Sequence, residues 1–374
     1  MLIYLGVSAL GIFLAALALL FFGSPPPLAA AHLVFAAGIL PLIFGAITHF
    51  VPVLTRSAQA GRRVLLAPLL LQAAGLLVFL YFEGVAGAWA LHAAISVALL
   101  ISLALGCWLI LRARRTLGKP HPGWRWYLAA IAFFSVSLLL VPLMAIMPDA
   151  YRPLRLLHLH MNTLGFIGLT AIGTLQVLLP TVLSGPDAEA AARLRTDLPF
   201  AIGGVLAVAL GSALWLPLAL VGALLLLHVV LRIGVSWWRR YGLRKILGDG
   251  ASAALAAGLA GFLLLILLGV AHAFSVVDAQ HAVPAFFGVF LMPLVTGALS
   301  QLLPVWCHAG RRTGERASMR GALVNGGLLR SILFLAGGLL LAAGNHEGIW
   351  LLAAGLLSFL FSILRSLLPG VTIR

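Results

Sequence analysis

Long apolar stretches separated by short polar connections dominate this chain. About twelve runs are long enough to cross a bilayer as a helix, which needs roughly 20 predominantly apolar residues. Leu, Ala and Gly fill them without the strict alternation typical of barrel strands. The pattern predicts an all-α polytopic membrane protein whose twelve transmembrane helices occupy residues 2–22, 29–53, 65–82, 88–111, 126–147, 155–183, 198–214, 217–237, 252–274, 281–306, 321–343 and 348–368.

A motif of Gly, six residues and Pro recurs at intervals of about 125 residues, which indicates an internal repeat. His32 and His160 each lie 20 residues before the proline of their copy, and His281 lies 23 residues before the third proline. We therefore expect one membrane domain, 1–374, built from three pseudo-repeats of four helices at about 1–120, 121–246 and 247–374. The three copies of the motif are Gly45–Pro52, Gly173–Pro180 and Gly297–Pro304.

Composition and charge agree with a membrane location. The chain is 63% hydrophobic and only 9% charged, whereas about a quarter of the residues in a soluble domain are charged. The net charge of +15 comes from basic residues that are spread over short loops, which argues against a nucleic-acid-binding surface. They follow the even-numbered helices, which predicts a bacterial-type inner membrane protein with both termini cytoplasmic. These residues are Arg56, Arg62, Arg63, Arg114, Arg115, Lys119, Arg125, Arg193, Arg195, Arg239, Arg240, Arg244, Lys245, Arg311, Arg312, Arg316 and Arg320.

Histidines supply the candidate chemistry. In this topology His32, His158, His160 and His281 begin helices on the outer side, and His272 ends a helix there. Recurrence at one depth in a repeat favours ligands of haem or a metal. Any one of them could instead be a half-solvated residue at the interface. All nine carboxylates are expected in loops or at helix ends, which argues against a proton-driven transporter.

The segment around His158 and His160 is the most specific local motif. Successive helical residues turn by about 100°, so these two rings should project onto opposite flanks and could each ligate a different centre. Gly165, Gly168 and Gly173 keep the helix slim enough for another helix or a flat macrocycle to approach. Imidazole is a common axial ligand of haem iron.

These residues resemble subunit I of the haem–copper oxidase superfamily, and more closely its short, divergent NnrS-like members. The resemblance rests on twelve helices in three groups of four, on His158-Leu-His160 followed by Gly165, Gly173 and Pro180, and on the stretch from His32 to Pro52. The His281-to-Arg312 stretch is loosely similar to a late NnrS segment. The His-x-His helix is sixth here and tenth in the oxidases.

The resemblance implies one or two haems, of b type, in a protein that handles electrons or a diatomic gas such as nitric oxide or oxygen. His32 and His160 would be a bis-histidine pair, His158 would bind a second haem, and Arg152 and Arg155 would neutralise propionates. His281 and His272 are further candidate metal ligands. A quinol or a cytochrome would donate electrons. No motif supports copper, and residues for a copper site or proton channels are not recognisable, so any oxidoreductase activity would be limited.

Two alternatives stay open. The chain could be a copper or other metal permease, although its six methionines show no paired Met-x-Met spacing. It could also be a cofactor-free assembly partner of an oxidase.

Overall fold

The computed structural model describes residues 1–23, 25–183, 185, 187–308, 310 and 314–367. Most of these residues are helical, none of them lies in a strand, and twelve helical segments are long and apolar enough to cross a membrane. All twelve correspond one to one with the segments expected from the sequence, so an all-α polytopic membrane protein is confirmed. Arg311 and Arg312, which belong to the basic loops of the predicted topology, lie outside the described residues.

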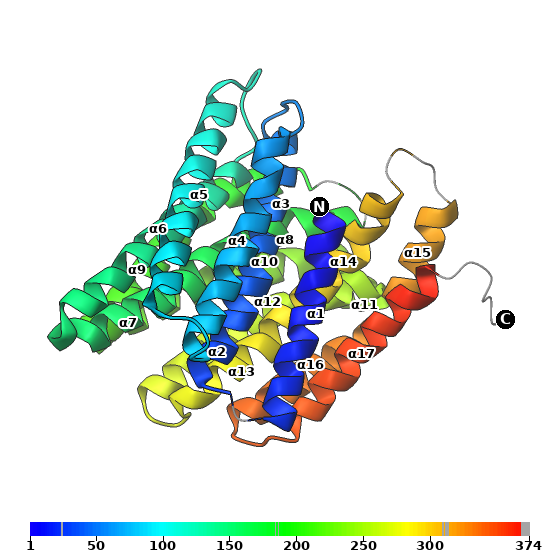
Figure 1. Ribbon diagram of the computed structural model, residues 1–374. Helices are drawn as coiled ribbons and strands as arrows, with labels where there is room; N and C mark the ends of the chain where they lie inside the picture. Colours follow the sequence, from blue (N-terminus) through cyan, green and yellow to red (C-terminus); the bar gives the residue numbers. More distant parts are fainter. Residues whose placement is uncertain (24, 184, 186, 309, 311–313, 368–374) are drawn as a thin grey trace. The chain divides into compact units, whose positions relative to one another are not determined.

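Figure 1 follows the chain through these helices. In order, the elements are α1 (Leu2–Phe22), α2 (Pro27–His32), η1 (Leu33–Ile39), α3 (Leu40–Leu54), α4 (Arg62–Phe82), α5 (Ala88–Arg114), α6 (Gly123–Ile146), η2 (Pro148–Ala150), α7 (Tyr151–His160), η3 (Met161–Gly168), α8 (Leu169–Leu183), α9 (Ala190–Leu214), α10 (Leu216–Tyr241), α11 (Leu243–Gly248), α12 (Gly250–Ala273), η4 (Ala279–His281), α13 (Ala282–Ala285), η5 (Phe286–Leu291), α14 (Met292–Cys307), α15 (Gly314–Val324), α16 (Gly327–Ala342) and α17 (Gly348–Leu367).

The helices form two compact units. The first comprises residues 1–5, 25–176 and 187–229. Within it, α4 packs against α2, η1, α3 and α5, and α6 packs against α5, α7 and η3. Helix α9 covers α7.

The second unit comprises residues 6–24, 177–186 and 230–374. Its central helix is α12, which packs against α14, η5 and α16, while α17 lies along α16. Each unit buries its own apolar side chains: Phe44 and Phe166 are buried in the first unit, and Phe290 and Phe334 in the second.

Each helix that carries the Gly-x6-Pro motif also contains a π-helical segment. These segments, η1, η3 and η5, begin 19, 19 and 18 residues before the respective motif proline. Runs of π-helix are rare and occur often at functional sites. Their recurrence at one position is what equivalent helices of a repeat would share. Relative to the motif, His32 and His160 each directly precede a π segment, whereas His281 lies five residues before one.

Three local features differ from, or sharpen, the sequence-based picture. Trp215 is extended and forms the short connection between α9 and α10, which correspond to the spans expected at 198–214 and 217–237. Helix α9 begins at Ala190, eight residues earlier than expected, and Asp197 is fully buried inside it. The prediction that all nine carboxylates lie in loops or at helix ends is therefore wrong for Asp197. The eleventh span is divided into α15 and α16 because Gly326 adopts a positive φ of 71°.

Candidate functional site

His32 ends α2 and is half-buried in the first unit. Its Nδ1 lies 2.7 Å from the carbonyl oxygen of Leu28, one helical turn earlier. The ring stacks on Phe82 of α4, with ring centroids 4.6 Å apart and planes inclined by 27°. A carbonyl can only accept, so Nδ1 carries the proton and Nε2 keeps its lone pair. Among the described residues Nε2 of His32 has no hydrogen-bond partner.

His158 has the same tautomer by a different route. Its Nδ1 lies 2.9 Å from the backbone carbonyl of Ser137 on α6, so this side chain is oriented by a neighbouring helix and not by its own. It too is half-buried, and Nε2 of His158 has no hydrogen-bond partner within the described part of the chain. Asn162, one turn further along, donates to the backbone carbonyl of His158 and stiffens the start of η3.

The fold brings His32 and His158 together. They come from the spans that carry the first and second copies of the Gly-x6-Pro motif, and they lie close enough to interact electrostatically. Histidines that bind a metal commonly donate the other ring N–H to a backbone carbonyl, which fixes the tautomer and the ring orientation. In both imidazoles Nδ1 is held by a carbonyl in this way.

His160 faces a different neighbour, as its spacing from His158 predicts. Its Nδ1 lies 2.8 Å from the carbonyl of Leu156 and 3.1 Å from Oγ of Ser212 on α9. The bond to the carbonyl one turn earlier, directly before a π segment, matches the environment of His32. His158 and His160 therefore serve two different flanks of α7, toward α6 and toward α9.

Aromatic side chains of α6 fill the space beside two glycines of this span. A Cβ at Gly165 would lie 2.7 Å from the Phe133 ring, and one at Gly173 would lie 2.8 Å from Trp126. We expected these glycines to admit either another helix or a flat macrocycle. At Gly165 and Gly173 the structure shows the close approach of another helix.

The other predicted site residues are two arginines on α7 and two histidines of the second unit. Arg152 and Arg155 are exposed on the first turns of α7, the helix that also carries His158 and His160. His272 and His281 belong to the second unit. His272 is exposed and holds the Val277 carbonyl through Nδ1, and the His281 ring packs on Gly344. Among the described residues, no group of three or more His, Cys, Asp or Glu side chains gathers as a metal site would require.

A buried polar cluster occupies the far end of α8. Arg193 donates from Nε to Gln176 Oε1 at 3.1 Å and from a terminal nitrogen to Asp187 at 3.0 Å. In the second unit Arg320 makes the same two kinds of bond, to Gln301 at 2.9 Å and to Asp249 at 2.6 Å. In both cases the glutamine lies within one turn of the motif proline. Two of the three motif helices are thus tied by an arginine to a nearby aspartate.

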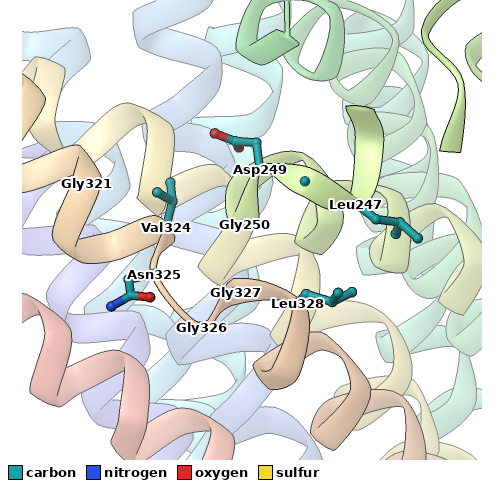
Figure 2. A pocket seen from close by; sticks show the side chains of 10 residues that line it. Leu247, Asp249, Gly250, Gly321, Val324, Asn325, Gly326, Gly327 and Leu328 are labelled. Atoms are coloured by element: carbon teal, nitrogen blue, oxygen red, sulfur yellow. The ribbon is translucent and has the colours of Figure 1, made fainter. Parts of the chain in front are cut away.

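A pocket of about 430 Å³ opens in the second unit where α12 begins (Figure 2). Glycines and the side chains of Asp249 and Asn325 line it. The Asp249 carboxylate is already used, because it caps α12 through the amides of Ala251 and Ser252 and binds Arg320. The pocket contains none of the candidate histidines.

Several groups that build the site carry no recognisable sequence signal. The carbonyls of Leu28 and Ser137 orient the two rings, yet every residue has a carbonyl and only the fold selects these. Phe82 and Ser212 are ordinary residues of spanning helices until packing sets them beside His32 and His160.

Comparison of the chain with models of known protein families found no match, and a search of curated proteins found no similar sequence.

Proposed function

We propose that this protein binds haem in the membrane and transfers electrons, with His32 and His158 as the axial ligands. The observation that carries the proposal is the pair of imidazoles from two pseudo-repeats, each with Nδ1 bound to a carbonyl and Nε2 without a partner. The resemblance to the oxidase superfamily instead implies that His32 and His160 are the two ligands of this haem. The electrostatic interaction between His32 and His158 supports the pairing proposed here.

The residues of the chain would fix the properties of the bound group. His32 and His158 would together hold the haem iron, and iron held by two imidazoles would supply electron transfer. The Leu28 and Ser137 carbonyls keep each Nδ1 protonated and raise the basicity of the opposite nitrogen. Phe82, stacked on His32, limits rotation of that ring and shields it on one face.

A diatomic gas such as nitric oxide or oxygen would need iron with an open position. His160 is the candidate for such a second haem, since it lies on the opposite flank of α7 and its Nδ1 is held in the same way. Arg152 and Arg155, at the start of the same helix, are the basic residues suited to haem propionates. A quinol or cytochrome would supply the electrons.

The predicted topology gives this site a location. With both termini cytoplasmic, His32, His158 and His160 lie toward the outer side of a bacterial-type inner membrane. The electron donor would then act near that side of the bilayer.

The test is haem, iron and copper quantified per chain in protein purified after haem-replete expression, using the pyridine haemochrome spectrum. We expect iron and porphyrin in equal amounts, and a loss of about tenfold or more of one haem in His32→Ala and in His158→Ala. His346→Ala, in an exposed connection, is the matched control and should retain haem.

His160→Ala separates the two ligand assignments. Full retention of the haem supports His32 with His158, and loss of one of two haems supports a second haem on His160. If His160→Ala and His32→Ala lose the same haem while His158→Ala keeps it, the pairing proposed here is wrong. Copper without porphyrin would replace the haem proposal with the metal-permease alternative.

A further inference from the structure

His228 is a polar residue exposed on the surface of the first unit, in the middle of a spanning helix. It lies twelve residues after the start of α10 and thirteen before its end, which places it midway along a spanning helix. Its side chain is exposed, and among the described residues its recorded contact is with the ring of Phe200 on α9, at a centroid distance of 5.4 Å. Neither ring nitrogen has a hydrogen-bond partner in the described part of the chain.

An imidazole at this depth has no water to bind. The middle of the bilayer offers no hydrogen-bonding groups, and the short histidine side chain is too far from either interface to reach water. On the side toward the start of α10 the exposed neighbours of His228 are apolar, and Arg232 lies one turn toward the end of the helix. Val221 and Leu224 lie on the same face of α10 at 51% and 65% exposure, and Phe200 is 43% exposed. A polar ring in the centre of such a face is typical of a contact between transmembrane helices, where histidine can bond across the interface.

We propose that this face, defined by Phe200, Val221, Leu224 and His228, binds the same face of a second copy of the chain. A neutral imidazole has one donor nitrogen and one acceptor nitrogen. Two copies related by a two-fold axis along the membrane normal bring His228 opposite His228, so that the donor of one ring meets the acceptor of the other. The unpartnered imidazole on this face is thus self-complementary, and the same imidazole of a second copy satisfies it.

The flanking residues suit such a contact. Val221, Leu224 and His228 project within about 60° of one another on α10, because they are spaced by three, four and seven residues. Parallel packing of two α10 helices across the axis therefore brings Leu224 near Leu224 of the second copy when His228 faces His228.

Disulfide cross-linking in native membranes tests the proposal. In a Cys107→Ala, Cys307→Ala background, Leu224→Cys should give a covalent dimer under mild oxidation. Leu100→Cys is the matched control, because Leu100 lies midway along α5 and is 68% exposed, and it should stay monomeric. Neither substitution enters the core, so both variants should fold.

Substitution of His228 measures its part in the contact. His228→Leu should weaken self-association roughly 5- to 30-fold, as a lost interhelical hydrogen bond in a membrane predicts, and His228→Gln should retain most of it because glutamine also donates and accepts. Single-molecule counting of labelled protein in lipid discs gives the monomer–dimer equilibrium.

Three results would overturn the inference: Leu224→Cys that fails to cross-link, a cross-link to a protein of different mass, or a monomer that binds a quinone through His228. Because the readout is association, loss of haem binding would leave the result unchanged.

Discussion

At the scale of single residues, the hydrogen bond at Nδ1 explains why particular histidines are suited to bind iron. His32 and His160 use the carbonyl one turn earlier in their own helix, and His158 uses one from α6. All three rings therefore have Nδ1 fixed. Within the described residues His281 packs on Gly344 and has no carbonyl bond of this kind. His272 has such a bond, to Val277, but its ring is exposed, so the bond together with partial burial distinguishes His32, His158 and His160.

The buried Arg193–Asp187 pair should contribute strongly to stability. Arg193 is 6% exposed, and the Asp187 side chain is 1% exposed. Arg193→Ala leaves the carboxylate buried without its partner, which typically costs about 3–5 kcal/mol. Thermal unfolding in detergent should show a clear loss for Arg193→Ala. Arg155→Ala, at an exposed position, should change the midpoint little, and equal effects of the two variants would contradict this role.

The sequence predicts residue-scale chemistry only in part. Spacing alone placed His158 and His160 on different flanks, because helical geometry is regular. It gave no reason to pair His32 with His158 in preference to His160, since that choice depends on which neighbouring helix lies beside each flank. Asp197 was misplaced because a helix beginning at Ala190 includes polar residues that an apolar window leaves out.

At the scale of elements, π segments set the geometry of the three motif helices. In two of these π segments, η1 and η5, a glycine of a neighbouring helix lies against the backbone of the fourth residue. A Cβ at Gly75 of α4 would lie 2.2 Å from the Ala36 carbonyl oxygen in η1, and one at Gly261 of α12 would lie 1.8 Å from that of Val289 in η5. Ala36 and Val289 are each three residues into their π segment. Gln72 of α4 also donates to η1, at the Ala37 carbonyl.

Gly75→Ala should therefore disturb the segment that follows His32. The added methyl meets backbone that cannot move aside, so α4 and η1 must separate. We expect lower thermal stability and lower haem content. Gly269→Ala in α12 is the control, because open space surrounds its Cβ and alanine is favoured over glycine by up to about 1 kcal/mol in a helix. A Gly75→Ala variant as stable and as haem-rich as Gly269→Ala would show that the close approach is unimportant.

Element bounds were predictable where apolar runs are long and bounded by charge or turn residues, as at Leu2–Phe22 and Ala88–Arg114. The π segments were not, because their sequences contain the same Leu, Phe, Ala and Gly as the helices around them. The break between α15 and α16 at Asn325–Gly326 was not predicted for a related reason. Glycine is common in spanning helices, so a single glycine does not indicate a turn.

At the scale of the whole molecule, the twelve candidate spans of the described residues and the uneven distribution of arginine predict the topology. An even number of crossings would place both termini on one side, and the basic connections predict that this side is the cytoplasm. Reporter fusions test this. A periplasm-active enzyme fused after His346 should be active, and the same enzyme fused after Lys119 should be inactive. The reverse pattern would invert the depth of every histidine.

The reduced-minus-oxidised absorption spectrum of the purified wild-type chain tests the central claim most directly. The account predicts a Soret band with sharp visible bands of a six-coordinate, bis-imidazole haem, lost in His158→Ala and unchanged in His346→Ala. A wild-type protein with no Soret band after haem-replete expression would contradict it.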